Sequence, residues 1–492
     1  MKMQSLLCLC RRYRRLRRGI HILDPYGEWL AYSGILFVLA GSLLTEGTLG
    51  CGGGSASPPP PGTGGGVPGF QAASTQQWVR QFGLGSILNT QAPQNTLVGV
   101  AVDSQGDAIV GAYTDGAYPG FSDSSFSAED VVAKFDPTGK QLWLQEVGTG
   151  QGDFLTGIAV DAGGDTYAIA TTAGAFPGYS NPSNTQQGVI FKLDPNGKLL
   201  WLQQLSALSE GNPQSIAITS NGDVIVGFQS FSFSTSGASP NGFLLTELNG
   251  ATGQFLKQQS YASNDYTLER LTVDGSGNIL IIGSGGLPGY TNTNPGAPLV
   301  VKIDGSTGDI LWGQSLASYS INKGIILFGV ATDSQDDVVV GGATATSTQT
   351  GISLSYDPAP SAQCILAKLN GMTGNTVWVK QFGTGAGDQI YSVAVDSSDN
   401  ILATGTTLGI FASPFVQPQD LNFAMKFEPS GQDIWVQQFG NGLILNVSVN
   451  GGPQAAVDAQ GNLLVGGDTQ GAFYGFSNPN NAVELFLAKF GP

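Results

Sequence analysis

Downstream of residue 78, the apolar residues fall into short runs of β-branched and aromatic side chains, separated by turns rich in Gly, Asp and Asn. One segment reads VAVDSQGDAIVGA from Val100, and a similar segment follows after each interval of about 60 residues. Short apolar runs bounded by turn residues predict β-strands joined by tight hairpins. The composition agrees, because 72 Gly and 25 Pro with only 11% charged residues disfavour long surface helices.

Three sequence signatures recur seven times each, in a fixed order. The first is an aromatic segment such as WVRQFG, found at Trp78, Trp143, Trp201, Phe255, Trp312, Trp378 and Trp435. The second is a β-branched run with a D-x-x-G-D/N turn, which begins at Val100, Ile158, Ile216, Leu271, Val330, Val393 and Ala455. The third is a strand that ends near a lysine, as in VVAKFDPTG and FLAKFGP.

Each repeat predicts four short strands, two from the middle signature and one from each of the others. A single four-stranded sheet cannot bury both faces, but a ring of such sheets can. We therefore predict an all-β fold over 78–492: a seven-bladed β-propeller of four-stranded antiparallel blades, with the aromatic of each outer strand between neighbouring blades. The last repeat ends at FLAKFGP and the first begins at QQWVRQFG, so the N-terminal strand is predicted to join the C-terminal blade along Phe486–Phe490 and close the ring.

The aromatic-x-x-Q-x-G strand, the VAVD-x-x-G-N hairpin and the V-x-K strand together resemble the SBBP family, a bacterial β-propeller repeat. The resemblance covers about 78–490 and implies the fold, because no activity is established for the family. Some repeats depart from the pattern. Thr219 stands in place of Asp, Phe255 in place of Trp, and Glu247 in place of Lys.

The first 50 residues have the layout of an export signal: a basic region, the apolar stretch 29–44 and small residues. Cys51 follows Thr48-Leu49-Gly50 and precedes a Gly/Ser/Pro-rich tether over 51–77. This order resembles the lipobox of bacterial lipoproteins, which implies lipidation of Cys51 and a membrane-anchored protein in the cell envelope. An uncleaved signal anchor, or a start site assigned too far upstream, would also account for the segment.

Charge and histidine content exclude several functions. Residues 51–492 keep 13 of 20 basic and 33 of 36 acidic residues, so their net charge is −20, which disfavours nucleic acids. The single histidine, His21, lies in the export signal, which excludes Ser-His-Asp and Cys-His catalysis downstream. Cys364, in the apolar run CILAKL, is expected to be a buried, inert thiol.

We expect no catalytic residues, cofactor or metal. The loops GTGQGD at 148–153 and GTGAGD at 383–388 precede strands rather than helices, which argues against a phosphate site. The aspartates of two turns, Asp103/Asp107 and Asp161/Asp165, could bind calcium. Because no D-x-D-x-D-G loop occurs, we expect them instead to accept hydrogen bonds from the backbone of their turns. A hydrolase or lyase that uses two carboxylates stays open, although no pair stands out.

The long, variable connections between the second and third strands of each repeat, and between repeats, are predicted to share one face. Several contain a motif such as GAYPGFSD or GAFPGYSN. Its aromatics are candidate ligand-binding residues: Tyr118, Phe121, Phe176, Tyr179, Tyr290, Phe473 and Phe476. The alternative interpretation is structural, with each aromatic filling the gap to the next blade.

These features predict a non-catalytic, monomeric scaffold that binds a protein or glycan at the cell envelope. A second hypothesis is an envelope assembly factor. Turns such as IDGSTGDILW resemble those of PQQ-like propeller repeats, and one lipoprotein with such repeats helps to assemble outer-membrane barrels. The carboxylate-dependent hydrolase is the third.

Overall fold

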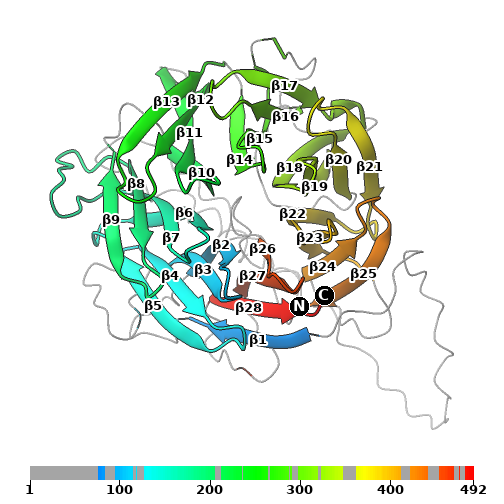
Figure 1. Cartoon of the computed structure of the whole chain (residues 1–492), viewed down its shortest axis with the longest axis horizontal. Coiled ribbons are helices and arrows are strands. Elements are labelled where there is room, and N and C mark those ends of the chain that lie inside the picture. Colours follow the sequence, from blue (N-terminus) through cyan, green and yellow to red (C-terminus); the bar gives the residue numbers. More distant parts are fainter. Residues whose placement is uncertain are drawn as a thin grey trace, which may run out of the picture. The chain divides into compact units, whose positions relative to one another are not determined.

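Seven four-stranded antiparallel sheets stand around a common axis in the computed structural model (Figure 1). The structure describes residues 76–83, 95–114, 118, 127–205, 212–234, 237–263, 266–287, 289–290, 297–319, 323–346, 362–411, 422–440, 454–469, 476 and 483–492. Within these ranges the only helical element is the 3₁₀ turn η1 (Ala317–Tyr319), and no helix is long and apolar enough to span a membrane. The predicted seven-bladed β-propeller is confirmed.

The first four blades are continuous in sequence, and each runs from an inner to an outer strand (Figure 1). Blade 1 contains β2 (Asn95–Val102), β3 (Ala108–Thr114), β4 (Glu129–Phe135) and β5 (Gln141–Val147). Blade 2 contains β6 (Asp153–Val160), β7 (Thr166–Thr172), β8 (Gln187–Leu193) and β9 (Leu199–Gln204). Blade 3 contains β10 (Asn212–Ile218), β11 (Val224–Ser234), β12 (Gly237–Leu248) and β13 (Phe255–Tyr261). Blade 4 contains β14 (Thr267–Val273), β15 (Ile279–Ser284), β16 (Pro298–Ile303) and β17 (Ile310–Ser315).

The remaining three blades complete the ring. Blade 5 contains β18 (Lys323–Thr332), β19 (Val338–Thr346), β20 (Cys364–Leu369) and β21 (Thr376–Phe382). Blade 6 contains β22 (Asp388–Val395), β23 (Ile401–Thr407), β24 (Asn422–Phe427) and β25 (Asp433–Phe439). Blade 7 contains β26 (Gln454–Val457), β27 (Leu463–Thr469), β28 (Glu484–Phe490) and, as its outer strand, β1 (Gln76–Phe82).

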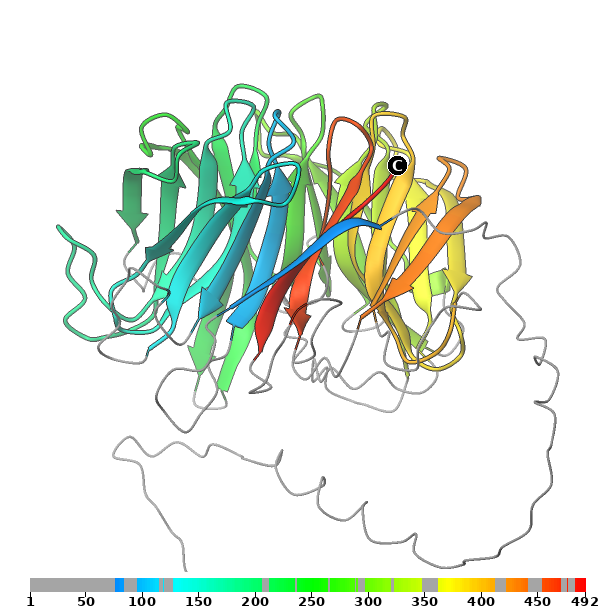
Figure 2. The same ribbon diagram turned by 90° about the horizontal axis from the view of Figure 1, so that it is seen from below.

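Ring closure occurs as the sequence predicts. The strand β1 runs antiparallel to β28, with Trp78 opposite Lys489 and Phe82 opposite Leu485 (Figure 2). In the other blades the outer strand follows the third strand through a short turn, whereas here the two strands come from opposite ends of the propeller sequence. This pairing ties the first blade to the last.

The hydrophobic core lies between neighbouring blades. The two middle strands of most blades are almost wholly buried, as in β4 and β8, while the outer strands are partly exposed. Glycines in the second strand let the next blade approach: a Cβ on Gly111 would overlap the side chains of Ile158 and Leu155 in blade 2. Cys364 is a free, buried thiol whose pKa is raised by burial, as expected for an inert cysteine.

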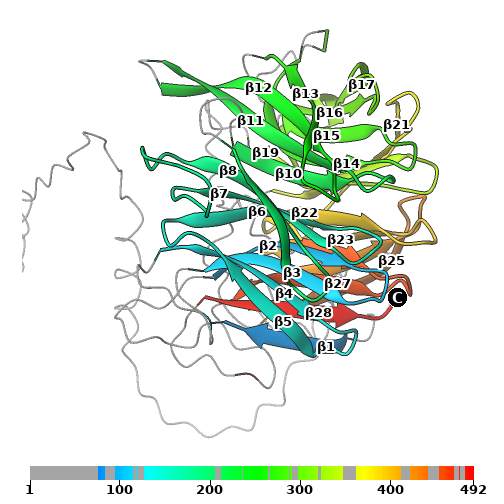
Figure 3. The ribbon, with the colours of Figure 1, turned by 60° about the vertical axis from the view of Figure 1, so that its left-hand side comes forward.

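The alternating strand directions give the ring two distinct ends. The turns between first and second strands, and between third and fourth strands, share one end, which we call the turn face (Figure 2). The connections between second and third strands, and between blades, share the other end, the loop face. On the loop face β11 and β12 extend past their neighbours and stay paired as far as Ser234 and Gly237 (Figure 3).

Candidate functional site

The aspartate of the first turn folds its hairpin in six of the seven blades. In blade 4, Asp274 Oδ1 accepts hydrogen bonds from the backbone amides of Ser276 (3.0 Å) and Asn278 (2.8 Å). The equivalent residues with the same pair of bonds are Asp103, Asp161, Asp333, Asp396 and Asp458. The predicted role of this aspartate in turn formation is confirmed.

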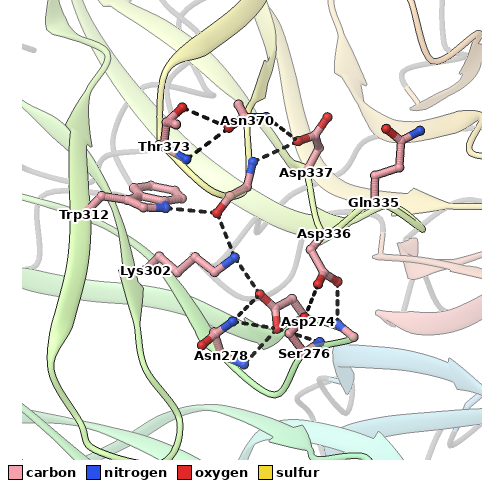
Figure 4. A network of polar contacts seen from close by, with 12 residues as sticks. Asp274, Ser276, Asn278, Lys302, Trp312, Gln335, Asp336, Asp337, Asn370 and Thr373 are labelled. Atoms are coloured by element: carbon pink, nitrogen blue, oxygen red, sulfur yellow. Dashed lines mark hydrogen bonds and ion pairs between the residues drawn. The ribbon is translucent and has the colours of Figure 1, made fainter.

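The other oxygen of the same carboxylate binds a buried lysine from the third strand. In blade 4, Lys302 Nζ lies 2.7 Å from Asp274 Oδ2 and donates to the Gly371 carbonyl of blade 5 at 2.8 Å (Figure 4). The side chains of Lys302 and Asp274 are 6% and 0% exposed, so solvent hardly screens this pair. The remaining pairs are Lys134–Asp103, Lys192–Asp161, Lys368–Asp333, Lys426–Asp396 and Lys489–Asp458. In blade 2 the pair is longer, at 3.6 Å, because Lys192 lies closer to Asp165, at 2.7 Å.

These ion pairs bear on the chemistry of the turn face. Burial opposes the charge of Lys368, but its hydrogen bonds to Asp333 and Asp337 outweigh burial and raise its pKa. A lysine held as a cation cannot act as a nucleophile or general base. Lys134 also lies within 3.2 Å of both Asp103 and Asp107, so an ammonium already neutralises the pair considered for calcium. Asp161 and Asp165 likewise face Lys192.

Five outer-strand tryptophans donate an indole hydrogen bond to the next blade, whereas Trp435 Nε1 is buried with no hydrogen-bond partner among the described residues. Trp312 Nε1 donates to the Gly371 carbonyl at 3.1 Å, beside the bond from Lys302 (Figure 4). Its ring also covers Gly374, whose φ of 72° suits glycine. The same indole bond to the following blade is made by Trp78, Trp143, Trp201 and Trp378. The predicted packing of the aromatic between blades is therefore confirmed.

In blade 3 an ion pair between Lys257 and Glu247 replaces the tryptophan and lysine of the other blades. Strand pairing places Lys257 opposite Glu247, where other blades have Trp opposite Lys, so Lys257 and not Phe255 occupies the tryptophan position. The sequence prediction for Phe255 is wrong by two residues, because that aromatic lies earlier on the strand, 59% exposed. Lys257 Nζ pairs with Glu247 (2.9 Å) and donates to the Gly305 carbonyl of blade 4 (2.5 Å). Thr219 accordingly replaces an aspartate that would have no lysine partner.

Two further aspartates bridge neighbouring turns. Asp336 of blade 5 accepts hydrogen bonds from Gly275 N (2.7 Å) and Ser276 Oγ (2.6 Å) of blade 4 (Figure 4). Asp399 of blade 6 binds Ser334 of blade 5 in the same way. Both aspartates stand at the glycine position of the turn, with φ of 61° and 62°. The bonds between blades offset the backbone strain at these positions.

On the loop face, the structure buries part of the predicted aromatic set. Tyr118 and Phe176 are 6% and 7% exposed, which fits the structural interpretation of the motif. Tyr290 is half-buried, and its ring covers Gly313 of its own blade. Tyr179 and Phe476 are each 36% exposed and can reach a ligand. Phe121 and Phe473 lie outside the described residues, as does Cys51.

The glutamine of the aromatic-x-x-Q strand fixes these loops, a role that the sequence did not reveal. Gln204 Oε1 accepts from Phe176 N (2.9 Å), and its Nε2 donates to Gly174 O (2.9 Å). Gln438 makes the same two contacts with Phe411 N and Gly409 O in blade 6. In sequence the only signal is that this side chain recurs three residues after tryptophan.

Three carboxyl groups meet at the loop end of the joint between blades 1 and 2. Glu129 and Asp130 begin β4, Asp153 begins β6, and all three are at most 8% exposed. Burial raises the pKa of Asp130 well above its usual range, the charges of Asp153 and Glu129 add to the rise, and the Leu155 amide partly offsets it. Such buried groups do not offer a substrate the accessible carboxylate pair of a glycosidase.

The glycine loop at 148–153 is part of the same joint. Thr149 N donates to Asp153 Oδ2 at 2.6 Å, and β6 begins at Asp153. Thr384 and Asp388 repeat this arrangement in the loop at 383–388. Both loops therefore end in a buried carboxylate and a strand, which is unsuitable for a phosphate. No cluster of three or more metal-ligating side chains occurs among the described residues.

Glu269 has a carboxyl pKa close to neutrality. It lies on the inner strand β14, where the pairing with β15 shifts register between Leu268 and Arg270. Burial raises its pKa to about 7, and the charge of Arg270 opposes the rise. A titratable group tuned to neutral pH is a candidate functional residue, and here its proton also links stability to pH.

Two solved structures are similar to the chain over most of its length. The Neurospora crassa Pan2 WD40 domain is 11% identical, with 86% of this chain and 98% of that chain covered and a TM-score of 0.49. Kuenenia stuttgartiensis hydrazine synthase is 12% identical, with 82% and 98% covered and a TM-score of 0.47. No curated protein sequence matches the chain.

The family comparison agrees with the repeat pattern. Residues 377–412 match the family described as SBBP, a beta-propeller repeat. This segment runs from the tryptophan strand β21 through the hairpin of β22 and β23, so it contains two of the three recurring signatures. The chain is thus a seven-bladed β-propeller that carries the SBBP repeat.

Proposed function

We propose that this chain is a non-catalytic scaffold that binds a protein or glycan through its loop face at the cell envelope. One observation carries the proposal: the two ends of the ring differ in how strictly they repeat. On the turn face, the first-turn aspartate of six blades lies within 3.6 Å of the buried lysine of the third strand. On the loop face, blade 2 has a compact connection at 173–186 and blade 3 a long paired hairpin.

Exposed apolar side chains on the loop face support ligand contact there. Phe154 (37% exposed), Leu408 (53%) and Ile410 (52%) lie at strand ends or in loops on that face, in addition to Tyr179 and Phe476. Aromatic and aliphatic side chains that project from a rigid frame give contact area at low entropic cost. The N-terminal sequence supports export and lipid attachment at Cys51, which would place this face outside the cytoplasm.

Binding by the purified full chain to a glycan array and to envelope proteins tests the proposal. A Tyr179→Ala/Phe476→Ala variant should bind at least about tenfold more weakly, the loss expected from two hot-spot aromatics. The matched control is Met372→Ala, because Met372 is 87% exposed on the turn face. Equal binding by all three proteins would contradict the loop-face assignment.

The same experiment separates the other hypotheses. Selective recovery of barrel-assembly proteins would favour an envelope assembly factor. Conversion of an arrayed glycan, abolished by one Asp or Glu substitution, would establish a hydrolase or lyase and overturn the non-catalytic assignment.

A further inference from the structure

The outer strand of blade 3 is exposed along nearly its whole length. Six of the seven residues of β13 are exposed, whereas each other outer strand has at most two exposed residues. Phe255 and Leu256 are 59% and 48% exposed. The exposure follows from the replacement of tryptophan by Lys257 in this blade. In other blades the tryptophan ring covers a glycine turn of the next blade, whereas Lys257 contacts the next blade through its ammonium group.

The strand is also an open sheet edge without charged protection. Among the described strands β13 pairs only with β12, which leaves its other edge open to a further strand. Its sequence, FLKQQSY, contains a single charge, and Glu247 of the same sheet neutralises that charge at 2.9 Å. Natural proteins usually protect long edge strands with unpaired charges, prolines or bulges, and the one register shift of β13 lies at its start, between Phe255 and Lys257. The regular part of the strand, Lys257–Tyr261, has its one charge neutralised and is suited to pairing with another strand.

We propose that β13 is a dimerisation edge, which pairs antiparallel with β13 of a second copy of this chain. The strand is complementary to itself about a twofold axis at Gln258. Lys257 then faces Gln259 of the second copy on either side of the axis, so no like charges are directly opposed. Twofold interfaces of one surface with itself are the commonest in soluble oligomers.

The neighbouring blade extends the apolar surface at this edge. Leu199 and Leu200 of β9 are 45% and 48% exposed. They adjoin Trp201, which contacts the turn that leads into β13 through its bond to Gly250 O (3.1 Å). Two blades joined in this way form one eight-stranded sheet. The dimer replaces the monomer expected from the sequence and does not depend on the ligand of the loop face.

Sedimentation equilibrium of the full chain in detergent, over a range of concentrations, tests this inference. The wild-type mass should rise toward twice that of one chain. Leu256→Lys should remain monomeric, because it adds a second positive charge and removes an apolar contact at the edge. The matched control is Leu311→Lys on β17, which has the equivalent strand position and the same 48% exposure and should associate like the wild type.

A second variant guards against loss of fold. Gln258→Lys places two lysines face to face on the axis and should also abolish association, while thermal unfolding of each variant reports whether the ring is intact. A wild type that is monomeric at every concentration would overturn the proposal. So would folded Leu256→Lys and Gln258→Lys proteins that associate like the wild type.

Discussion

Substitution of Lys302 by Met tests the role of the buried ion pairs in holding the ring together. The change keeps the length of the side chain and removes its charge. Asp274 is left buried without its cation, with only the bond from Asn278 Nδ2 (3.0 Å) at the oxygen that Lys302 occupied, and the bond to the Gly371 carbonyl of blade 5 is lost. Loss of one partner of a buried pair costs about 3–5 kcal/mol, so we expect a decrease in the free energy of unfolding of this size.

A second substitution separates loss of the pair from loss of packing. Asn in place of Asp274 still accepts the turn amides of Ser276 and Asn278 but carries no charge. The Asp274→Asn/Lys302→Met protein should therefore recover most of the loss and come within about 1–2 kcal/mol of the wild type.

Urea unfolding followed by tryptophan fluorescence provides the measurement, with far-UV circular dichroism to check that both probes report one transition. A decrease of less than about 1 kcal/mol in the unfolding free energy of Lys302→Met would refute the reasoning, since exposed pairs contribute about 0–1 kcal/mol. A double variant as unstable as the single variant would do the same.

Three further predictions concern blade 3, the inner strand and the N-terminus. Glu247→Lys places two ammonium groups where an ion pair of 2.9 Å stood and should lower stability by about 2–4 kcal/mol in the urea assay, whereas adding Thr219→Asp and Lys257→Trp should restore it. The pKa of Glu269 is raised from 4.5 to about 7, so the folded state favours the protonated carboxyl group. The stability that this proton contributes is complete below about pH 4.5 and is lost as pH rises through 7. Glu269→Gln should abolish this decline in unfolding free energy, about 1–3 kcal/mol, and an unchanged pH profile would contradict the assignment. Cys51→Ser should move the chain from the membrane to the soluble fraction and remove the lipid mass from its N-terminal peptide, and retention in the membrane would favour an uncleaved anchor.

The repeat count and the ring closure were accessible from sequence because both depend on order along the chain. Seven copies of each signature require seven sheets, and an aromatic strand at the start with none at the end requires the pairing of β1 with β28. The turn aspartates were predictable for a similar reason, since their hydrogen bonds reach only two and four residues ahead.

Contacts between signatures could not be predicted in the same way. The lysine of the third strand binds the aspartate of an earlier turn, and only the fold brings Lys302 to Asp274. The sequence pattern aligns Phe255 with the tryptophans because all are aromatic. The residue that holds the tryptophan position is Lys257, as its hydrogen bond to the next blade shows. The exposure of the loop aromatics depends on hydrogen bonds between outer-strand glutamines and the loop backbone, such as the bond between Gln204 and Phe176 N.

Hydrogen exchange along β1 of the full chain tests most directly whether the N-terminal strand closes the ring. If β1 is the outer strand of blade 7, the Val79–Phe82 segment should contain amides protected to the same degree as their equivalents in Leu144–Val147 of β5, which holds the same place in blade 1. Exchange of every β1 amide at the rate of an unstructured peptide, with β5 still protected, would contradict closure.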